Sequence, residues 1–211
     1  MPGKVLTIAQ QKGGSGKTTL AVNLAQYYMA QGKSVAVLDT DPQGSLGRWF
    51  FARRARLGGD VGLELGTSSA WGVSYECEKL RKTHDIVIVD TPPKIDADLR
   101  PALREADLVL VPVAASHVDL WATEGVLELA ARERRPLLIV MNRVSARARL
   151  TATVAGEIAA MDVNCAATQL GSRTAFAEAL GLGLAAAELA RSGPAAHEIA
   201  ALAAEIDQVL Y

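Results

Sequence analysis

The sequence has 211 residues, half of them hydrophobic, and a formal net charge of −1. This length is enough for one well-buried domain, and we expect a single domain over residues 1–211. The balanced charge excludes binding to nucleic acid or membranes through overall charge, so any such affinity must come from a local patch.

The predicted elements alternate between short apolar, β-branched runs and longer helical patterns. We expect strands at residues 5–9, 34–38, 61–65, 86–89, 108–111, 137–141 and 163–168. We expect helices at residues 17–31, 45–57, 70–83, 97–105, 117–133, 150–161, 173–179 and 195–209, with a loop or helix break at 180–187. Near-continuous apolar strands are buried on both faces. The pattern therefore predicts an α/β fold with one doubly wound, mostly parallel sheet and helices on both faces.

The remaining composition points to a cytoplasmic protein. The two cysteines, Cys77 and Cys165, lie far apart and match no metal-ligand spacing, which suits a reducing compartment. The chain leads directly into its first strand, so we expect no signal peptide. No apolar run is long enough to span a bilayer, and we expect no membrane attachment.

A glycine-rich loop follows the first strand, with the sequence QKGGSGKTT at residues 11–19. Glycines allow successive backbone N–H groups to converge on an anion, and the start of the next helix adds its positive dipole end. The loop departs from the pattern G-x-x-x-x-G-K-[ST], because position 11 is Gln. It carries an additional lysine, Lys12, five residues before Lys17. The pattern predicts a phosphate site at which Lys12 adds a second charge, either on the same anion or on that of a neighbouring subunit.

Acidic residues follow two of the predicted strands. Asp39 and Asp41 come after the second strand, and Asp90 ends the fourth. In a parallel sheet these carboxylates meet at the rim that carries the glycine-rich loop, where Mg²⁺ is held in phosphoryl-transfer sites. The alternative for each acid is a turn or helix N-cap residue.

These motifs resemble those of the ParA/MinD family of P-loop ATPases, also called deviant Walker ATPases. The resemblance rests on KGGSGKTT at 12–19, DTDPQGS at 39–45 and residues 85–93, and it covers most of the chain more weakly. It implies ATP and Mg²⁺ as cofactors and a homodimer that forms when ATP binds.

The resemblance also implies roles for individual residues. Lys12 would reach the partner subunit's nucleotide, Lys17 would hold the β/γ-phosphates, and Asp41 would orient the attacking water. Thr18, Asp39 and Asp90 would form the metal shell. The phosphate cradle would consist of Gly13, Gly14, Ser15, Gly16, Lys17, Thr18 and Thr19. Asn142 is a candidate for adenine contact, with a plain turn residue as the alternative.

Comparison with the branches of this family favours the small ParA subgroup, whose members are ParF-like. Residues 195–211 contain no Lys or Arg, unlike the basic membrane helix of MinD-like proteins. The subgroup implies non-specific DNA binding, nucleoid association and a ParB-like or cargo-adaptor activator. The DNA-binding candidates are Arg143, Arg147, Arg149 and Arg173, with Arg48, Arg53, Arg54, Arg56 and Arg191 as further arginines.

Two other functions remain open from the sequence. One is a P-loop synthetase or kinase that phosphorylates a small molecule. The other is a nucleotide-switched adaptor of a secretion or polysaccharide-synthesis machine. The sequence does not distinguish among plasmid, chromosome, chemoreceptor cluster and microcompartment as cargo.

Overall fold

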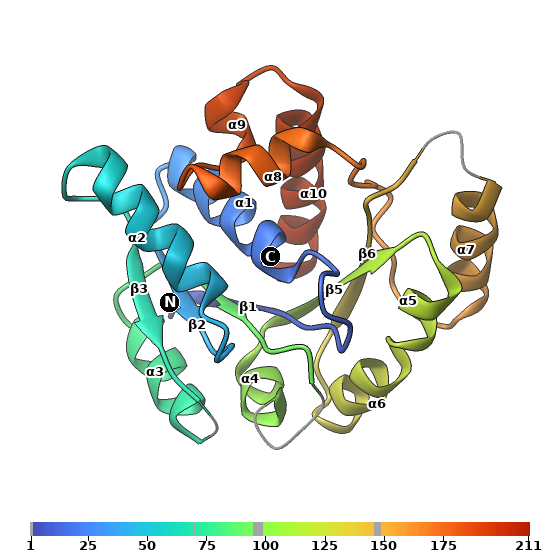
Figure 1. The fold of residues 1–211 in the computed structure, drawn as a ribbon. Helices are drawn as coiled ribbons and strands as arrows, with labels where there is room; N and C mark the ends of the chain where they lie inside the picture. The colour runs from blue at the N-terminus through green and yellow to red at the C-terminus, as the bar shows by residue number, and fades with distance from the viewer. Residues whose placement is uncertain (1, 70, 95–98, 146–148) are drawn as a thin grey trace.

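The computed structural model describes residues 2–69, 71–94, 99–145 and 149–211. They form a six-stranded sheet in the order β3-β2-β4-β1-β5-β6 (Figure 1), and all of its strand pairs are parallel. The strands are β1 (Lys4–Ile8), β2 (Val35–Asp39), β3 (Glu64–Thr67), β4 (Ile86–Asp90), β5 (Leu108–Ala114) and β6 (Leu137–Asn142). The predicted α/β fold with a doubly wound parallel sheet is therefore confirmed.

Helices cover both faces of this sheet (Figure 1). One layer holds α1 (Lys17–Ala30), α2 (Ser45–Leu57), α8 (Thr174–Gly181), α9 (Ala186–Leu189) and α10 (Pro194–Leu210). The other holds α3 (Gly72–Leu80), α4 (Leu99–Glu105), α5 (His117–Trp121), α6 (Glu124–Arg132) and α7 (Arg149–Ala160). In the part of the chain that the structure describes, no helix has the length and apolar character needed to cross a membrane.

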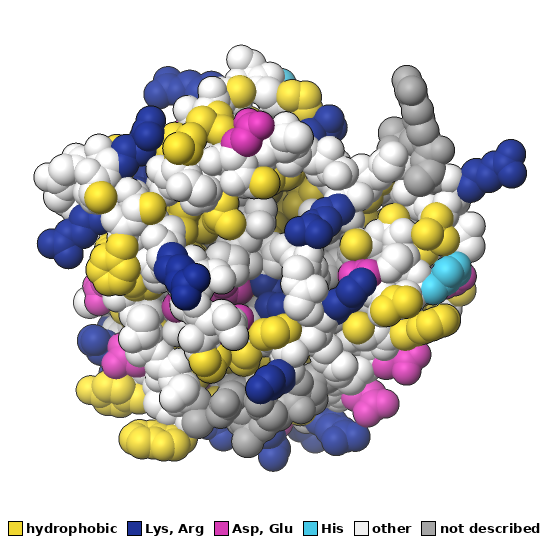
Figure 2. All heavy atoms as spheres, viewed as in Figure 1, with side chains coloured by type: hydrophobic (Ala, Val, Ile, Leu, Met, Phe, Trp, Pro, Cys, Tyr) yellow, Lys and Arg dark blue, Asp and Glu magenta, His cyan; other side chains and the backbone are white. Residues whose placement is uncertain are grey.

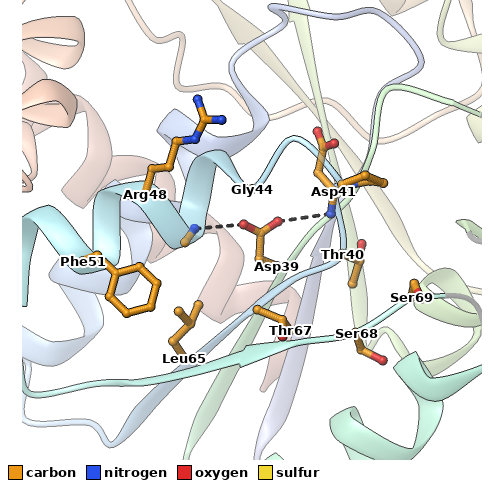
Figure 3. Close-up of a pocket in the computed structure, with 12 residues that line it drawn as sticks. Asp39, Thr40, Asp41, Gly44, Arg48, Phe51, Leu65, Thr67, Ser68 and Ser69 are labelled. Atoms are coloured by element: carbon orange, nitrogen blue, oxygen red, sulfur yellow. Dashed lines mark hydrogen bonds between the residues drawn. The ribbon is translucent and has the colours of Figure 1, made fainter.

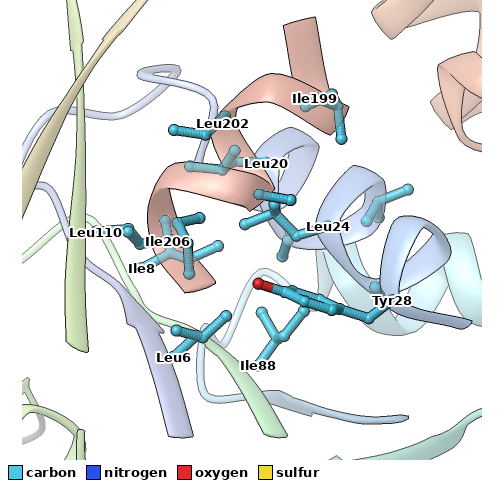
Figure 4. Close-up of a cluster of buried hydrophobic side chains, with 14 of the residues drawn as sticks. Leu6, Ile8, Leu20, Leu24, Tyr28, Ile88, Leu110, Ile199, Leu202 and Ile206 are labelled. Atoms are coloured by element: carbon cyan, nitrogen blue, oxygen red, sulfur yellow. The ribbon is translucent and has the colours of Figure 1, made fainter. Parts of the chain in front are cut away.

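The core follows from the alternation of side chains along the buried strands. On β1, Leu6 and Ile8 point to the layer of α1 and α10, whereas Val5 belongs to the cluster on the opposite face. Figure 4 shows the first cluster, in which Tyr28 lies among aliphatic side chains. The Tyr28 hydroxyl donates a 3.0 Å hydrogen bond to Asp207 of α10, so its buried polar atom is satisfied.

The predicted strand at 163–168 is wrong. Cys165 of this segment forms an isolated bridge with Ile139 of β6, and Gly171, just beyond the segment, forms a second one with Val144, just after β6. Between the two bridges the segment advances one residue more than its partner, so the register slips and no continuous ladder forms. The segment nevertheless supplies backbone partners to β6, including the 2.8 Å bond from Ala166 N to Ile139 O.

Three other predicted segments differ from the structure. The stretch at 180–187, expected to be a loop or helix break, contains the end of α8 and the first residues of α9. The helix expected at 117–133 is divided into α5 and α6, because the buried Thr123 hydroxyl bonds Leu120 O at 2.5 Å and competes with helix continuation. The strand expected at 61–65 begins later, at Glu64. A turn precedes it, in which Gly62 has φ of 75° and donates its N–H to Asp60.

Candidate nucleotide site

The glycine-rich loop lies at the carboxyl end of β1, near the middle of the sheet, and leads directly into α1. Lys17 is 6% exposed, and its ammonium donates to Gln10 O at 3.1 Å and Lys12 O at 3.5 Å. Burial lowers the pKa of Lys17, an effect opposed by the nearby carboxylates of Asp90 and Asp41. Two backbone carbonyls thus hold the Lys17 ammonium inside the glycine-rich loop.

Two loop glycines adopt conformations that side chains disfavour. Gly14 has φ of 76° and Gly16 has φ of 97°. A Cβ on Gly16 would also lie 2.3 Å from the side-chain nitrogen of Asn142. Between these glycines the buried Ser15 hydroxyl has no partner among the described residues. An unpaired donor in a backbone cradle fits a phosphate oxygen.

Asn142 ends β6 and anchors this loop. Its Nδ2 donates to Ser15 O at 2.8 Å, and its Oδ1 accepts from Arg143 N at 2.9 Å. The Asn142 side chain therefore joins the backbone of the glycine-rich loop to the backbone just after β6. The predicted adenine contact did not include this role. The adenine contact itself stays a prediction.

Thr18, in the first turn of α1, contacts Asp90 at the end of β4. The Thr18 hydroxyl donates to Asp90 Oδ2 at 2.6 Å, while buried Oδ1 of Asp90 has no partner in the described structure. Burial is the main cause that raises the pKa of Asp90 to about 7, with Thr18 and Lys17 acting against it. A hydroxyl beside an unsatisfied carboxylate oxygen is a donor set that fits Mg²⁺.

Asp39 and Asp41 diverge after β2, although they are two residues apart. Asp39 is buried and accepts the N–H groups of Asp41 at 3.1 Å and Gly47 at 2.8 Å (Figure 3). Burial raises the pKa of Asp39, and these backbone hydrogen bonds oppose that shift. Asp39 therefore ties the loop to the start of α2, and its predicted place in the metal shell stays a prediction. Asp41 is half-buried and accepts Gln43 N at 2.9 Å.

Lys12 pairs with a carboxylate that the sequence analysis did not identify. Its ammonium lies 2.5 Å from Asp119 Oδ2 in α5. A sequence signal was available, because Ser116 and Asp119 follow a strand with the [ST]-x-x-[DE] spacing of a helix start. Ser116 is indeed the N-cap of α5 and accepts Asp119 N at 3.1 Å.

Two adjoining cavities open above the loop. One, of about 340 Å³, is lined by Gly13, Lys17, Thr18 and, across from them, Asp41. The next, of about 460 Å³, extends over α8, where Phe176 lines it. Their shared walls are Gly16, Thr19, Arg143 and Leu180. A cationic cavity lined by the glycine-rich loop, continuing into a cavity with an aromatic wall at Phe176, can accommodate a nucleotide that extends from one into the other.

A third cavity, of about 640 Å³, lies on the other side of the loop after β2 (Figure 3). Phe51 of α2 and Leu65 of β3 form its apolar wall, and Thr67 and Ser68 supply hydroxyl groups. Asp41 lines this side cavity as well as the phosphate cavity.

Two of the arginines predicted to contact DNA, Arg143 and Arg173, line the cavity that extends over α8. Arg143 and Arg149 are exposed, whereas Arg173 pairs with Glu198. Arg147 lies outside the described residues. Figure 2 shows Lys and Arg scattered over this face among uncharged side chains. Arg53 is 5% exposed and bonds Glu188 at 2.7 and 2.8 Å, so this further candidate is not available to DNA.

Known proteins resemble this chain in sequence and in fold. A relative from Halothiobacillus neapolitanus, the maintenance of carboxysome distribution protein A, is 30% identical over 97% of this chain and 94% of its own. The chromosome-partitioning ATPase Soj of Thermus thermophilus is 31% identical over 95% and 94%. The septum site-determining protein MinD of Pyrococcus horikoshii, complexed with Mg-ADP, superposes with a TM-score of 0.80 at 17% identity, covering 98% of this chain and 96% of that chain.

A family model describes the sequence directly. The CobQ/CobB/MinD/ParA nucleotide-binding domain matches residues 6–184, which include the glycine-rich loop, both acidic strand ends and Asn142. With this match and the cradle above β1, the chain belongs to the CobQ/CobB/MinD/ParA family of nucleotide-binding domains.

Proposed function

We propose that this chain is a Mg²⁺-dependent ATPase that forms an ATP-bound sandwich dimer and binds DNA non-specifically. Slow, partner-stimulated hydrolysis would segregate DNA or position a protein cargo on the nucleoid. The observation that carries the proposal is the set of charges at one cavity: Lys17 and Asp41 line it, and Lys12 adjoins it beside Gly13. Two relatives that match nearly full length are named for chromosome partitioning and carboxysome distribution.

The phosphate groups of ATP fit the loop residues. Backbone N–H groups of residues 13–19 and the Ser15 hydroxyl would bind the phosphate oxygens, with Lys17 on the β/γ-phosphates. Thr18 and Asp90 would hold Mg²⁺, directly or through water, with Asp39 behind them. The metal would neutralise charge on the transferring phosphoryl group.

Hydrolysis requires a water placed in line with the γ-phosphate, and Asp41, which lines the phosphate cavity, would orient it. Its carboxylate faces the phosphate cavity from the wall opposite the glycine-rich loop. Lys12 would add charge at the nucleotide of the partner subunit, which makes dimerisation and hydrolysis interdependent. ATP binding would then form the dimer, and hydrolysis would dissolve it.

DNA contact would come from exposed arginines. Arg143 lies at the nucleotide cavity, so its position would depend on the bound nucleotide, and Arg149 is the exposed first residue of α7. Arg147 is between them in sequence. Arg173 would first have to leave Glu198. Contacts of this kind bind phosphate without reading base sequence, and dimerisation doubles their number. The proposed site of action is the cytoplasmic nucleoid, and a ParB-like or cargo-adaptor protein would stimulate hydrolysis there.

The decisive experiment measures DNA binding by Asp41→Ala, in which hydrolysis stalls and the dimer persists. With Mg-ATP we expect binding to duplexes of any sequence, weakening at least tenfold between about 50 and 200 mM salt. With ADP, or in Lys12→Ala and Lys17→Ala, we expect none. Asp162→Ala, a change at an exposed acid away from the nucleotide cavity, is the matched control and should behave as the unmodified chain.

Absence of DNA binding by ATP-loaded Asp41→Ala at low salt would contradict the proposal. Phosphate transfer to a small metabolite would instead identify a synthetase or kinase. Co-purification with one membrane complex, without DNA, would identify a nucleotide-switched adaptor.

A further inference from the structure

The two edges of the sheet differ in how their backbone groups are used. At β6, the segment that follows α7 supplies partners, such as Ala166 N, which donates to Ile139 O at 2.8 Å. β3 lies at the other end of the strand order, and among the described residues no backbone group pairs with its outer side. An unpaired edge strand is a template for an added strand.

The unpaired backbone groups of β3 belong to Leu65 and Thr67. Ser68 N donates to Asp39 O of β2 at 3.2 Å. Because backbone N–H and C=O groups alternate in direction along a parallel strand, those of Leu65 and Thr67 point away from β2. Each of these residues therefore offers one donor and one acceptor at the outer edge. Both residues also line the side cavity, so the edge and the cavity form one continuous surface.

The side cavity has room for a side chain of a bound peptide. Its volume is about 640 Å³, and Figure 3 shows Phe51 of α2 directed toward Leu65 of β3. Phe51 is 61% exposed. In an added strand, every second side chain lies on this face of the sheet. An apolar side chain there would cover the exposed part of Phe51, and its burial favours binding.

The charge of α2 favours an acidic partner. The helix contains four arginines and no acidic residue. Arg53 is bonded to Glu188, whereas Arg48 is exposed, lines the side cavity and has no ion pair among the described residues. Arg48 lies about one helical turn before Phe51. An acidic side chain two residues from the apolar one, on the same face of the added strand, would therefore lie near Arg48.

We propose that the outer edge of β3 and the side cavity bind an extended peptide of a partner protein by strand addition. The peptide carries an apolar side chain for Phe51 and, two residues away, an acidic side chain for Arg48. Duplex DNA would contact the arginine but leave the edge of β3 unused, so the observations favour a peptide. This inference goes beyond the proposed function, because it requires neither a nucleotide nor a second copy of the chain.

The test measures binding of two end-capped, threonine-rich peptides to the unmodified chain by fluorescence anisotropy, without nucleotide. One peptide carries valine and, two residues later, aspartate, and the other has the reverse order, because an added strand can run in either direction. At least one peptide is expected to bind with a Kd of about 10–500 µM. Exchanging its aspartate for lysine is expected to weaken binding about three- to tenfold.

Variants of α2 test the two side-chain contacts. Phe51→Ala is expected to weaken peptide binding about three- to tenfold, and Arg48→Glu is expected to remove the preference for aspartate over lysine. Leu57→Ala and Arg56→Glu are matched controls, because both residues are exposed on the same helix and neither lines the side cavity in the described structure. Both control variants are expected to bind the peptide as the unmodified chain does.

N-methylation of the peptide tests strand addition directly. Alternate amides of an added strand face β3, and the others face solvent. Methylating one alternate set is therefore expected to abolish binding, and methylating the other set is expected to change the Kd by less than about threefold. Thr67→Pro removes an outward N–H and is expected to abolish binding while the pairing with β2 persists, which thermal unfolding checks. Should Thr67→Pro not fold, the methylated peptides give the same test on the unmodified chain.

Four outcomes would overturn the proposal. One is that neither peptide shows saturable binding up to about 2 mM, and another is that the two methylated sets have equal effects. Duplex DNA that binds through Arg48, where neither peptide binds, would assign this surface to DNA. Self-association that Thr67→Pro removes, again without peptide binding, would place a second copy of the chain on β3. A chain that binds the peptides but forms no ATP-dependent dimer contradicts the proposed function alone.

Discussion

The Thr18 hydroxyl and the Asp90 carboxylate are joined by a 2.6 Å hydrogen bond that links the start of α1 to the end of β4. The second carboxylate oxygen of Asp90 is buried and without a partner in the described structure. Leaving a buried hydrogen-bond acceptor unpaired costs free energy, and a cation bound to this oxygen would remove that cost.

Replacing Asp90 by Asn tests the metal assignment. We expect Asp90→Asn to weaken ATP binding about tenfold in the presence of Mg²⁺, because a carboxylate that faces the metal has lost its charge. In EDTA the two proteins should bind ATP equally. Calorimetric titration measures both, and Asp85→Asn at the opposite end of β4 is the control. Equal loss with and without Mg²⁺ would contradict a metal role.

The titration of Asp90 should appear in the stability of the metal-free, nucleotide-free chain. Burial raises its pKa from 3.8 to about 7, so between these values the folded chain holds a proton that the unfolded chain has lost. Rising pH therefore weakens folding through this window and has no further effect through Asp90 above it. The difference in unfolding free energy between the unmodified chain and Asp90→Asn should fall by about 2–4 kcal/mol from pH 4 to pH 7. Urea unfolding in EDTA measures it, and a flat difference would refute the shifted pKa.

Gly16 should tolerate no side chain. With φ of 97° and a Cβ position 2.3 Å from Asn142 Nδ2, Gly16→Ala combines backbone strain with a clash. We expect a loss of about 2–4 kcal/mol in unfolding free energy, together with loss of nucleotide binding. Gly13→Ala is the matched control for stability, because a Cβ there meets no atom within 4 Å. Similar destabilisation by both substitutions would contradict this account.

Replacing Asn142 tests whether its side chain anchors the glycine-rich loop or contacts the base of the nucleotide. If its main role is the 2.8 Å bond to Ser15 O, Asn142→Ala should weaken ATP and GTP binding by the same factor, about tenfold. A direct adenine contact would instead reduce the preference for ATP over GTP. Competition binding with both nucleotides distinguishes the two, and Asn164→Ala, in the segment that follows α7, controls for loss of an asparagine.

The sheet could be predicted because strands buried on both faces carry a strong local signal. Residues 86–89 and 108–111 are apolar without interruption, and both are strands in the structure. The segment at 163–168 carries a weaker pattern, interrupted by Asn164, and the one-residue slip between its bridges to residues 139 and 144 depends on tertiary register. Likewise, the break at Thr123 comes from a side-chain hydrogen bond that helical periodicity does not reveal.

The glycine-rich loop could be recognised because successive residues form one phosphate cradle. Its supports come from far along the chain: Asn142 binds Ser15, and Asp119 holds Lys12. Leu180 lies in a stretch expected to be a loop or helix break, and it belongs to α8 and to the walls of both nucleotide cavities. Such long-range partners are set by the packing of the sheet, which a single sequence does not specify residue by residue.

The loop after β2 separates the phosphate cavity from the side cavity, and Asp41 of this loop lines both. A molecule whose affinity for the side cavity depends on the orientation of Asp41 would also change the contact between the Asp41 carboxylate and a bound nucleotide. Thermodynamic linkage makes the effect mutual: a nucleotide that reorients Asp41 alters the affinity of the side cavity by the same factor. Asp41 is thus the residue through which occupancy of one cavity would be linked to occupancy of the other.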